Sequence, residues 1–188
     1  MYLLKQSLSV FLLLMCYWAT PVWAADSSAG EQKAATCLGC HGPRGKSSSA
    51  QWPNLAAQQE AYLVNQLKAF KSGARSNTMM QSMAANLSDD DIDNLAAYFA
   101  GLQPVKAGGD SALAKSGQAK ASMCLGCHGS SAEGNGQFPR LAGQHPDYLI
   151  KQLKSFKAGE RKSGPMQGIA SGLSDDDMKA LAAYFGSL

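Results

Sequence analysis

The chain has 188 residues, and its 17 basic and 14 acidic side chains leave a formal net charge of only +3. This weak balance, with no basic cluster interleaved with aromatic residues, excludes nucleic acid as an expected partner. Without the N-terminal segment described next, about 164 residues remain, enough for one domain or two small ones.

The start of the chain is predicted to be an export signal. Lys5 provides a basic start, residues 8–18 form an apolar run as long as a signal-peptide core, and residues 22–24 (VWA) form a small-x-small cleavage site. The apolar run is shorter than the roughly 20 residues that a membrane span needs. We therefore expect export and cleavage after Ala24. An uncleaved anchor is the alternative, and a lipid anchor at Cys16 is disfavoured because a bulky methionine precedes that cysteine.

The rest of the chain is a tandem duplication. Residues 62–102 and 148–188 align without a gap at an offset of 86, with 23 identities in 41 positions. Repeat units of about 80 residues have the size of domains rather than of solenoid repeats. The segment between them has the Pro, Gly and small polar residues of a linker. The predicted organisation is a signal peptide at 1–24, a first domain at 25–102, a linker at 103–112 and a second domain at 113–188.

Both halves are predicted to be helical, and no alternating strand pattern of useful length appears in either. The closing helix of each half begins after Ser88 or Ser174, and Asp91 or Asp177, three residues later, completes a capping box. Apolar residues at helical spacing follow each cap and form one face. The predicted class is therefore all-α. The earlier helices are expected at residues 29–38, 59–72, 116–125 and 145–158.

Each half needs more than its own side chains to fill its centre. Three short helices in about 80 residues rarely gain more than about 3–5 kcal/mol from a hydrophobic core. A large bound group in each half would supply the missing apolar contacts.

The sequence CLGCHG occurs twice, at residues 37–42 and 124–129. Once the signal is removed, the remaining cysteines are those of the two motifs: Cys37, Cys40, Cys124 and Cys127. On a helical turn, both thiols and the following imidazole, His41 or His128, point the same way. Two thiols that add to the vinyl groups of a haem, and an imidazole that binds its iron, match this spacing. We therefore predict one covalently attached haem c in each half.

Three other uses of these cysteines are less consistent with the pattern. About 83 residues separate the two pairs, which is far beyond the spacing of a zinc ribbon. A thioredoxin-like redox pair is expected in a βαβ setting, which the helical pattern does not provide. Disulfides would suit an exported chain but would not require a histidine after each second cysteine.

The second axial ligand of each iron should occupy equivalent positions in the two halves. His145 aligns with a glutamine of the first half rather than with a histidine, so we expect it to be a solvated residue at a helix start. Met80 and Met166 align at the offset of 86, and each is followed by glutamine. We predict that they ligate iron from a loop between two helices; the alternative is that they fill the core. Met79 and Met83 have no methionine counterparts, and Met83 is expected to be ordinary core.

At these residues the chain resembles the diheme cytochromes c4, and each half resembles a small class I cytochrome c. The resemblance covers everything after the signal: both CxxCH motifs, the YLxxQLxxFxxGxR run, the methionine and the LSDxDxxxLAAYF closing helix. It implies two tandem domains, each a small helical bundle around one haem c. It also implies a carrier of electrons in the bacterial periplasm.

The resemblance extends to four residues around the haems. In the family, a proline carbonyl accepts a hydrogen bond from the iron-binding histidine, and Pro53 and Pro139 stand where that acceptor is expected. Arg75 and Arg161 match positions that meet haem propionates; the alternative is that they are ordinary surface arginines.

His–Met ligation of both irons would leave no open site for a substrate, so we expect an electron carrier rather than an enzyme. The resemblance implies redox proteins as partners: a quinol-oxidising complex or another donor, and a terminal oxidase or similar acceptor. A diheme peroxidase-like enzyme and the cytochrome subunit of a dehydrogenase are the alternatives. Peripheral association with the membrane stays open.

Charge differs between the halves. Residues 25–102 carry 6 basic and 7 acidic side chains, a net of −1, and residues 113–188 carry 9 and 6, a net of +3. In the alignment of the two halves, Asn54 corresponds to Arg140. This difference would give the two haems different electrostatic settings. The hypothesis is that the halves meet different partners; the alternative is a solvated helix face. Much of the second charge comes from Lys151, Lys154, Lys157, Arg161 and Lys162.

Overall fold

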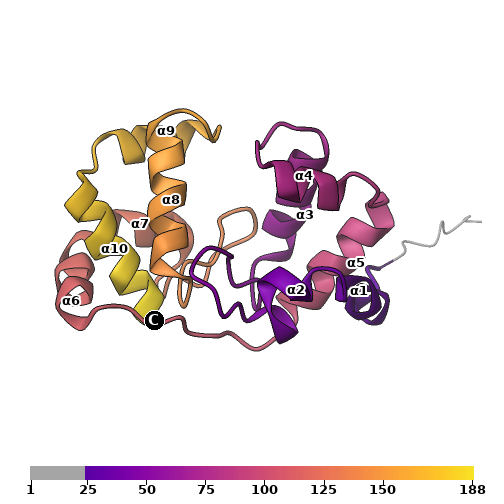
Figure 1. Ribbon diagram of the computed structural model, residues 1–188. Helices are drawn as coiled ribbons and strands as arrows, with labels where there is room; N and C mark the ends of the chain where they lie inside the picture. Colours follow the sequence, from indigo (N-terminus) through magenta and orange to yellow (C-terminus); the bar gives the residue numbers. More distant parts are fainter. Residues whose placement is uncertain (1–23) are drawn as a thin grey trace, which may run out of the picture.

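The computed structural model of the protein describes residues 24–188 (Figure 1). The predicted signal peptide, apart from Ala24, lies outside the described residues. The described chain forms two helical halves that lie side by side. The first half contains α1 (Ser27–Ala34), α2 (Leu38–His41), the 3₁₀ turn η1 (Pro43–Gly45), α3 (Glu60–Lys71), α4 (Thr78–Ala84) and α5 (Asp89–Ala100). The second contains α6 (Ser111–Lys120), α7 (Ser122–His128), α8 (Pro146–Lys157), α9 (Gly164–Ser171) and α10 (Asp175–Ser187).

The helical class and the longest helices are confirmed. Within residues 24–188 the only β-type pairing is an isolated bridge between Asn135 and Phe138. Helices α3 and α8 lie within a residue of the predicted bounds at both ends. Ser88 and Ser174 cap α5 and α10 through the predicted capping boxes, in which the serine hydroxyl accepts from the third helical N–H and the aspartate accepts from the serine N–H.

The prediction of one continuous helix at 29–38 and another at 116–125, each carrying the first cysteine of its motif near its end, is wrong. Helix α1 ends at Ala34, three residues before Cys37, and the second half breaks between α6 and α7 at Ala121. At the first break the Cys37 N–H donates to the Ala34 carbonyl at 2.8 Å, an i→i−3 bond that tightens the chain into a turn. The CLGCHG segment of the first half therefore follows a turn and does not continue α1.

The first and last long helices of each half cross closely, with a glycine at each crossing. A Cβ at Gly30 would lie 2.0 Å from the Asn94 carbonyl oxygen of α5, and one at Gly117 would lie 2.0 Å from the Ala180 carbonyl oxygen of α10. Only hydrogen fits at these two positions. The crossing of α6 with α10 is visible at the edge of Figure 1.

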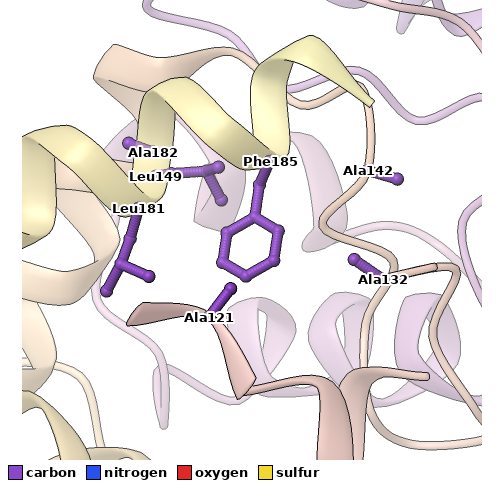
Figure 2. Packing of buried hydrophobic residues seen from close by; sticks show 7 residues of the cluster. All are labelled: Ala121, Ala132, Ala142, Leu149, Leu181, Ala182 and Phe185. Atoms are coloured by element: carbon purple, nitrogen blue, oxygen red, sulfur yellow. The ribbon is translucent and has the colours of Figure 1, made fainter. Parts of the chain in front are cut away.

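Small residues surround a few large ones in each core. In the second half, Phe185 of α10 lies among Leu149, Leu181 and four alanines (Figure 2). The equivalent cluster of the first half contains Leu63, Leu95 and Phe99. These cores are small, as predicted.

The segment between the halves is hydrogen-bonded to the second one. Ala107 N–H donates to the Gly143 carbonyl at 3.1 Å, and Gly108 N–H donates to the Gly186 carbonyl at 2.9 Å. Helix α6 begins at Ser111 with Asp110 as its cap, so it takes up the last two residues of the predicted linker. None of the helices in the described part of the chain combines the length and the apolar character that crossing a membrane requires.

Candidate haem sites

The histidine of each CLGCHG motif is buried and held in one orientation. His41 closes α2 and His128 closes α7, and each is 6% exposed. His41 Nδ1 lies 2.9 Å from the Pro53 carbonyl oxygen, and His128 Nδ1 lies 2.8 Å from that of Pro139. A carbonyl oxygen can only accept, so Nδ1 carries the proton in both rings.

The unprotonated nitrogen of each ring is therefore Nε2. Burial lowers the pKa of both imidazoles, which favours the neutral ring. A neutral imidazole with a fixed Nδ1–H presents the Nε2 lone pair in a fixed direction, as metal-binding histidines do. Both histidines thus suit an iron-binding role.

The four cysteines of the motifs differ in exposure. Cys37 and Cys124 are half-buried, Cys40 and Cys127 are exposed, and none is in a disulfide. Burial raises the pKa of the Cys37 and Cys124 thiols. In residues 24–188 no three His, Cys, Asp or Glu side chains converge to hold a metal ion, so the zinc alternative finds no ligand set there.

One continuous cavity of about 1250 Å³ runs through both halves. Pockets for a single drug-sized ligand measure about 300–1,000 Å³, so this cavity has room for more than one small molecule. It is lined largely by apolar side chains, such as Leu63 and Phe99 in the first half and Leu149 and Phe185 in the second. All eight residues predicted to bind the two haems line it: Cys37, Cys40, His41, Met80, Cys124, Cys127, His128 and Met166. The residues present therefore fit two large, flat, apolar groups, each next to two thiols and an imidazole.

The predicted iron-binding methionines lie on short helices rather than in loops. Met80 is in the first turns of α4, where the Asn77 side chain caps the helix by accepting from the Met80 N–H at 3.0 Å. Met166 lies in α9 after Pro165. The expectation that Met83 is ordinary core is wrong: it is 42% exposed and lines the same cavity, as does Met79. Three methionines of the first half thus share α4.

Arg75 and Arg161 lie at the boundary between the halves and form a mutual network. Arg75 donates to Gln66 in its own half and to Gln152 and Tyr148 in the other, at 2.7–3.0 Å. Arg161 does the reverse, with Gln152, Gln66 and Tyr62 at 2.8–3.0 Å. Each guanidinium also stacks on a phenylalanine of its own half. Both arginines also line the cavity. Their contact with a haem propionate stays a prediction.

Other residues join the halves in ways that the sequence pattern did not predict. The expectation that His145 is solvated is wrong, because its Nε2 lies 3.0 Å from the Ser47 carbonyl oxygen of the first half. Gln58 and Gln144 are buried at the boundary and bind the backbone of the opposite half. The one signal for these glutamines is that each follows its predicted proline by five residues.

The sequence pattern of the cytochrome c family matches this chain twice, over residues 27–103 and 114–188. A cytochrome c4 from Azotobacter vinelandii is 36% identical over 189 residues, which covers 88% of this chain and 90% of the relative. The chain belongs to the cytochrome c4 family. The crystal structure of reduced cytochrome c4 from Pseudomonas stutzeri superposes with a TM-score of 0.82 at 37% identity, covering 88% of this chain and all of that one.

A thiosulfate dehydrogenase electron acceptor from Thiomonas intermedia is also similar, at 34% identity over 98% of this chain and 91% of the relative. Membership of the cytochrome c4 family confirms the two predicted haem c groups, covalently attached, and the two tandem domains around them. It also confirms a carrier of electrons rather than an enzyme, whose partners are redox proteins.

Proposed function

We propose that the protein relays single electrons between redox partners through two haems ligated by His41 and Met80 in the first half and by His128 and Met166 in the second. The observation that carries this is the fixed Nδ1–H of both histidines, which leaves Nε2 free to bind iron. Haem c supplies one-electron redox chemistry when bound. The residues Cys37, Cys40, Cys124 and Cys127 would attach it.

The chain's own contribution is rigidity and exclusion of water. Each histidine ring is held by burial and by a proline carbonyl, so its orientation need not change when charge arrives. Met80 and Met166 would each supply a neutral thioether ligand, and His–Met ligation would raise the potential relative to harder ligands. With one histidine and one methionine of this chain holding each iron, a substrate would find no open coordination site.

The finer assignment of partners and place belongs to the same proposal. We propose a periplasmic protein, exported by the signal at residues 1–24, that accepts electrons from a quinol-oxidising complex or another donor and delivers them to a terminal oxidase. The basic start and apolar run of that segment support export. The similar electron acceptors of thiosulfate dehydrogenase favour a second candidate, in which a dehydrogenase is the donor.

Part of the positive charge of the second half is engaged in contacts within the molecule. Arg161 is engaged in the network between the halves, and Lys154 pairs with Asp175 at 2.9 Å. Lys151 and Lys162 are exposed and remain available for an acidic partner surface. If they steer such a partner to this half, its rate of association falls as ionic strength rises.

The methionine assignment is tested by three matched substitutions on α4. Met80→Ala removes the proposed ligand, so one of the two haems loses its methionine-to-iron charge-transfer band and its potential falls. Met166→Ala has the same effect on the other haem. Met79→Ala and Met83→Ala are the controls, because these methionines line the same cavity but have no counterpart in the second half. Loss of the band in Met83→Ala or Met79→Ala, with Met80→Ala unchanged, would contradict the assignment.

A further inference from the structure

The carbonyl that holds each histidine belongs to a peptide group whose other end is held by the opposite half. Pro53 O and Asn54 N belong to one peptide group, and Pro139 O and Arg140 N belong to another. The first accepts from His41 and the second from His128. The N–H on the far side of each peptide therefore points away from its histidine.

A buried glutamine from the opposite half binds each of these N–H groups. Gln144 Oε1 accepts from Asn54 N–H at 2.8 Å, and Gln58 Oε1 accepts from Arg140 N–H at 2.7 Å. The same side chains then turn their amide N–H groups to the next carbonyl. Gln144 Nε2 donates to Asn54 O at 2.9 Å, and Gln58 Nε2 donates to Arg140 O at 3.1 Å.

These glutamines are fixed in place. Gln58 is 6% exposed and Gln144 is 5% exposed, and no buried side-chain nitrogen or oxygen in the described part of the chain lacks a partner. The two contacts repeat each other across the duplication, since Gln58 and Gln144 align at the offset of 86. The same buried contact therefore occurs in both directions across the boundary, which an incidental surface contact would not do.

We propose that Gln144 positions His41 and tunes the haem of the first half, while Gln58 positions His128 and tunes the haem of the second. Each glutamine is a positioning residue that acts across the boundary between the halves. The inference rests on the proposed ligation of iron by His41 and His128.

The physical reason is the polarisation of hydrogen bonds in a chain. An acceptor on the N–H of an amide draws its electrons toward the carbonyl oxygen, so that oxygen becomes a stronger acceptor for the histidine Nδ1–H. A stronger bond at Nδ1–H makes the imidazole a more basic ligand. A more basic ligand stabilises oxidised iron over reduced iron, so each glutamine lowers the potential of the haem in the other half.

The test measures both haems of the intact diheme protein after substitution at one boundary glutamine. Gln58→Leu removes the acceptor for Arg140 N–H. We expect the haem of the second half to become easier to reduce. The equilibrium constant for moving an electron from the first haem to the second should rise by up to about tenfold. For a one-electron couple that is about 59 mV. Gln144→Leu should give the mirror image, a shift of the first haem alone.

A second readout reports on the histidine itself. In the reduced protein, the Nδ1–H proton of His128 should exchange faster with solvent in Gln58→Leu, while that of His41 stays unchanged. Gln58→Glu keeps an oxygen acceptor for Arg140 N–H and should restore slow exchange. Gln59→Leu is the matched control, because Gln59 donates across the same boundary to Glu133 O without touching either proline peptide. Where the leucine variant does not mature, Gln58→Asn serves, since its shorter side chain cannot reach Arg140.

The inference is overturned if Gln58→Leu shifts the haem of its own half, shifts both haems equally, or shifts neither. It is also overturned if Gln59→Leu shifts the second haem as much. In each of these cases both haems stay low-spin with histidine ligation, and the proposed function stands. Lack of a haem-linked Nδ1–H signal in the unsubstituted protein would instead overturn the proposed ligation, and this inference with it.

Discussion

At the scale of single residues, the two boundary arginines depend on the shape of the guanidinium as much as on its charge. Arg75 and Arg161 share the acceptors Gln66 and Gln152, and each reaches a tyrosine of the opposite half. A planar fork can serve several acceptors at once, and it can stack on an aromatic ring at the same time. A lysine ammonium has neither property.

Arg75→Lys should therefore destabilise the protein although it keeps the charge. A hydrogen bond to a charged group contributes about 1.5–3 kcal/mol, and the lysine loses at least one of the three. We expect the free energy of unfolding of the holoprotein to fall by about that amount in denaturant titration. Arg44→Lys is the control, because Arg44 is exposed and makes no side-chain hydrogen bond in the described part of the chain. Equal stability of the Arg75→Lys protein would show that the network contributes nothing.

At the scale of helices, the paired crossings α1–α5 and α6–α10 set the frame around each site. Gly30 and Gly117 allow the helices to approach until backbone nearly meets backbone. Each crossing glycine lies in a helix, α1 or α6, that comes directly before a CLGCHG motif. A displaced crossing would therefore move the cysteines and the histidine as well. The glycines thus act on the site through packing.

Gly117→Ala should test this packing. Its Cβ would meet the Ala180 carbonyl oxygen at 2.0 Å and the Tyr184 side chain at 2.9 Å, so α6 must move away from α10. Overpacking of this kind costs about 1–3 kcal/mol, which thermal unfolding of the holoprotein would reveal. Gly168→Ala in α9 is the control: a Cβ there has no neighbour within 4 Å, and the helix should gain up to about 1 kcal/mol. Equal melting temperatures for the two variants would rule out the tight crossing.

Local signals in the sequence predict these elements unequally well. The capping boxes at Ser88 and Ser174 and the apolar faces of α3 and α8 predict helices that the structure contains, since caps and periodicity are properties of neighbouring residues. Helix α4 has only seven residues, Thr78–Ala84, and it buries only Ala84, so its apolar pattern is too short to stand out in the sequence. The sequence pattern therefore predicts a loop where the structure has a short helix capped by Asn77.

At the scale of the whole molecule, the duplication predicts two similar halves but not how they meet. Gln58, Gln144 and His145 are polar residues in loops or at a helix end, and such residues are ordinarily exposed. Here they are buried or half-buried because the halves pack against each other. Contacts between distant parts of a chain follow from tertiary packing, so no local pattern could have revealed the glutamine links to the proline peptides.

If the halves stay together in solution, two loop amides should be unusually protected. Asn54 N–H and Arg140 N–H are bound by buried glutamines across the boundary. We expect both to exchange with deuterium as slowly as amides in the cores of α5 and α10, because exchange then requires the halves to part. The amide of Ser48, which lies in an exposed loop, is the control and should exchange quickly. Fast exchange at Asn54 and Arg140 would mean that the halves separate readily.

The proposed function requires that each half hold a haem between a histidine and a methionine. A reduced-minus-oxidised absorption spectrum with quantitation of haem, recorded on the exported and matured protein, measures it directly. We expect two haems per chain, both low-spin, with a methionine-to-iron charge-transfer band for each. One haem per chain, or a high-spin iron that binds cyanide at once, would contradict it.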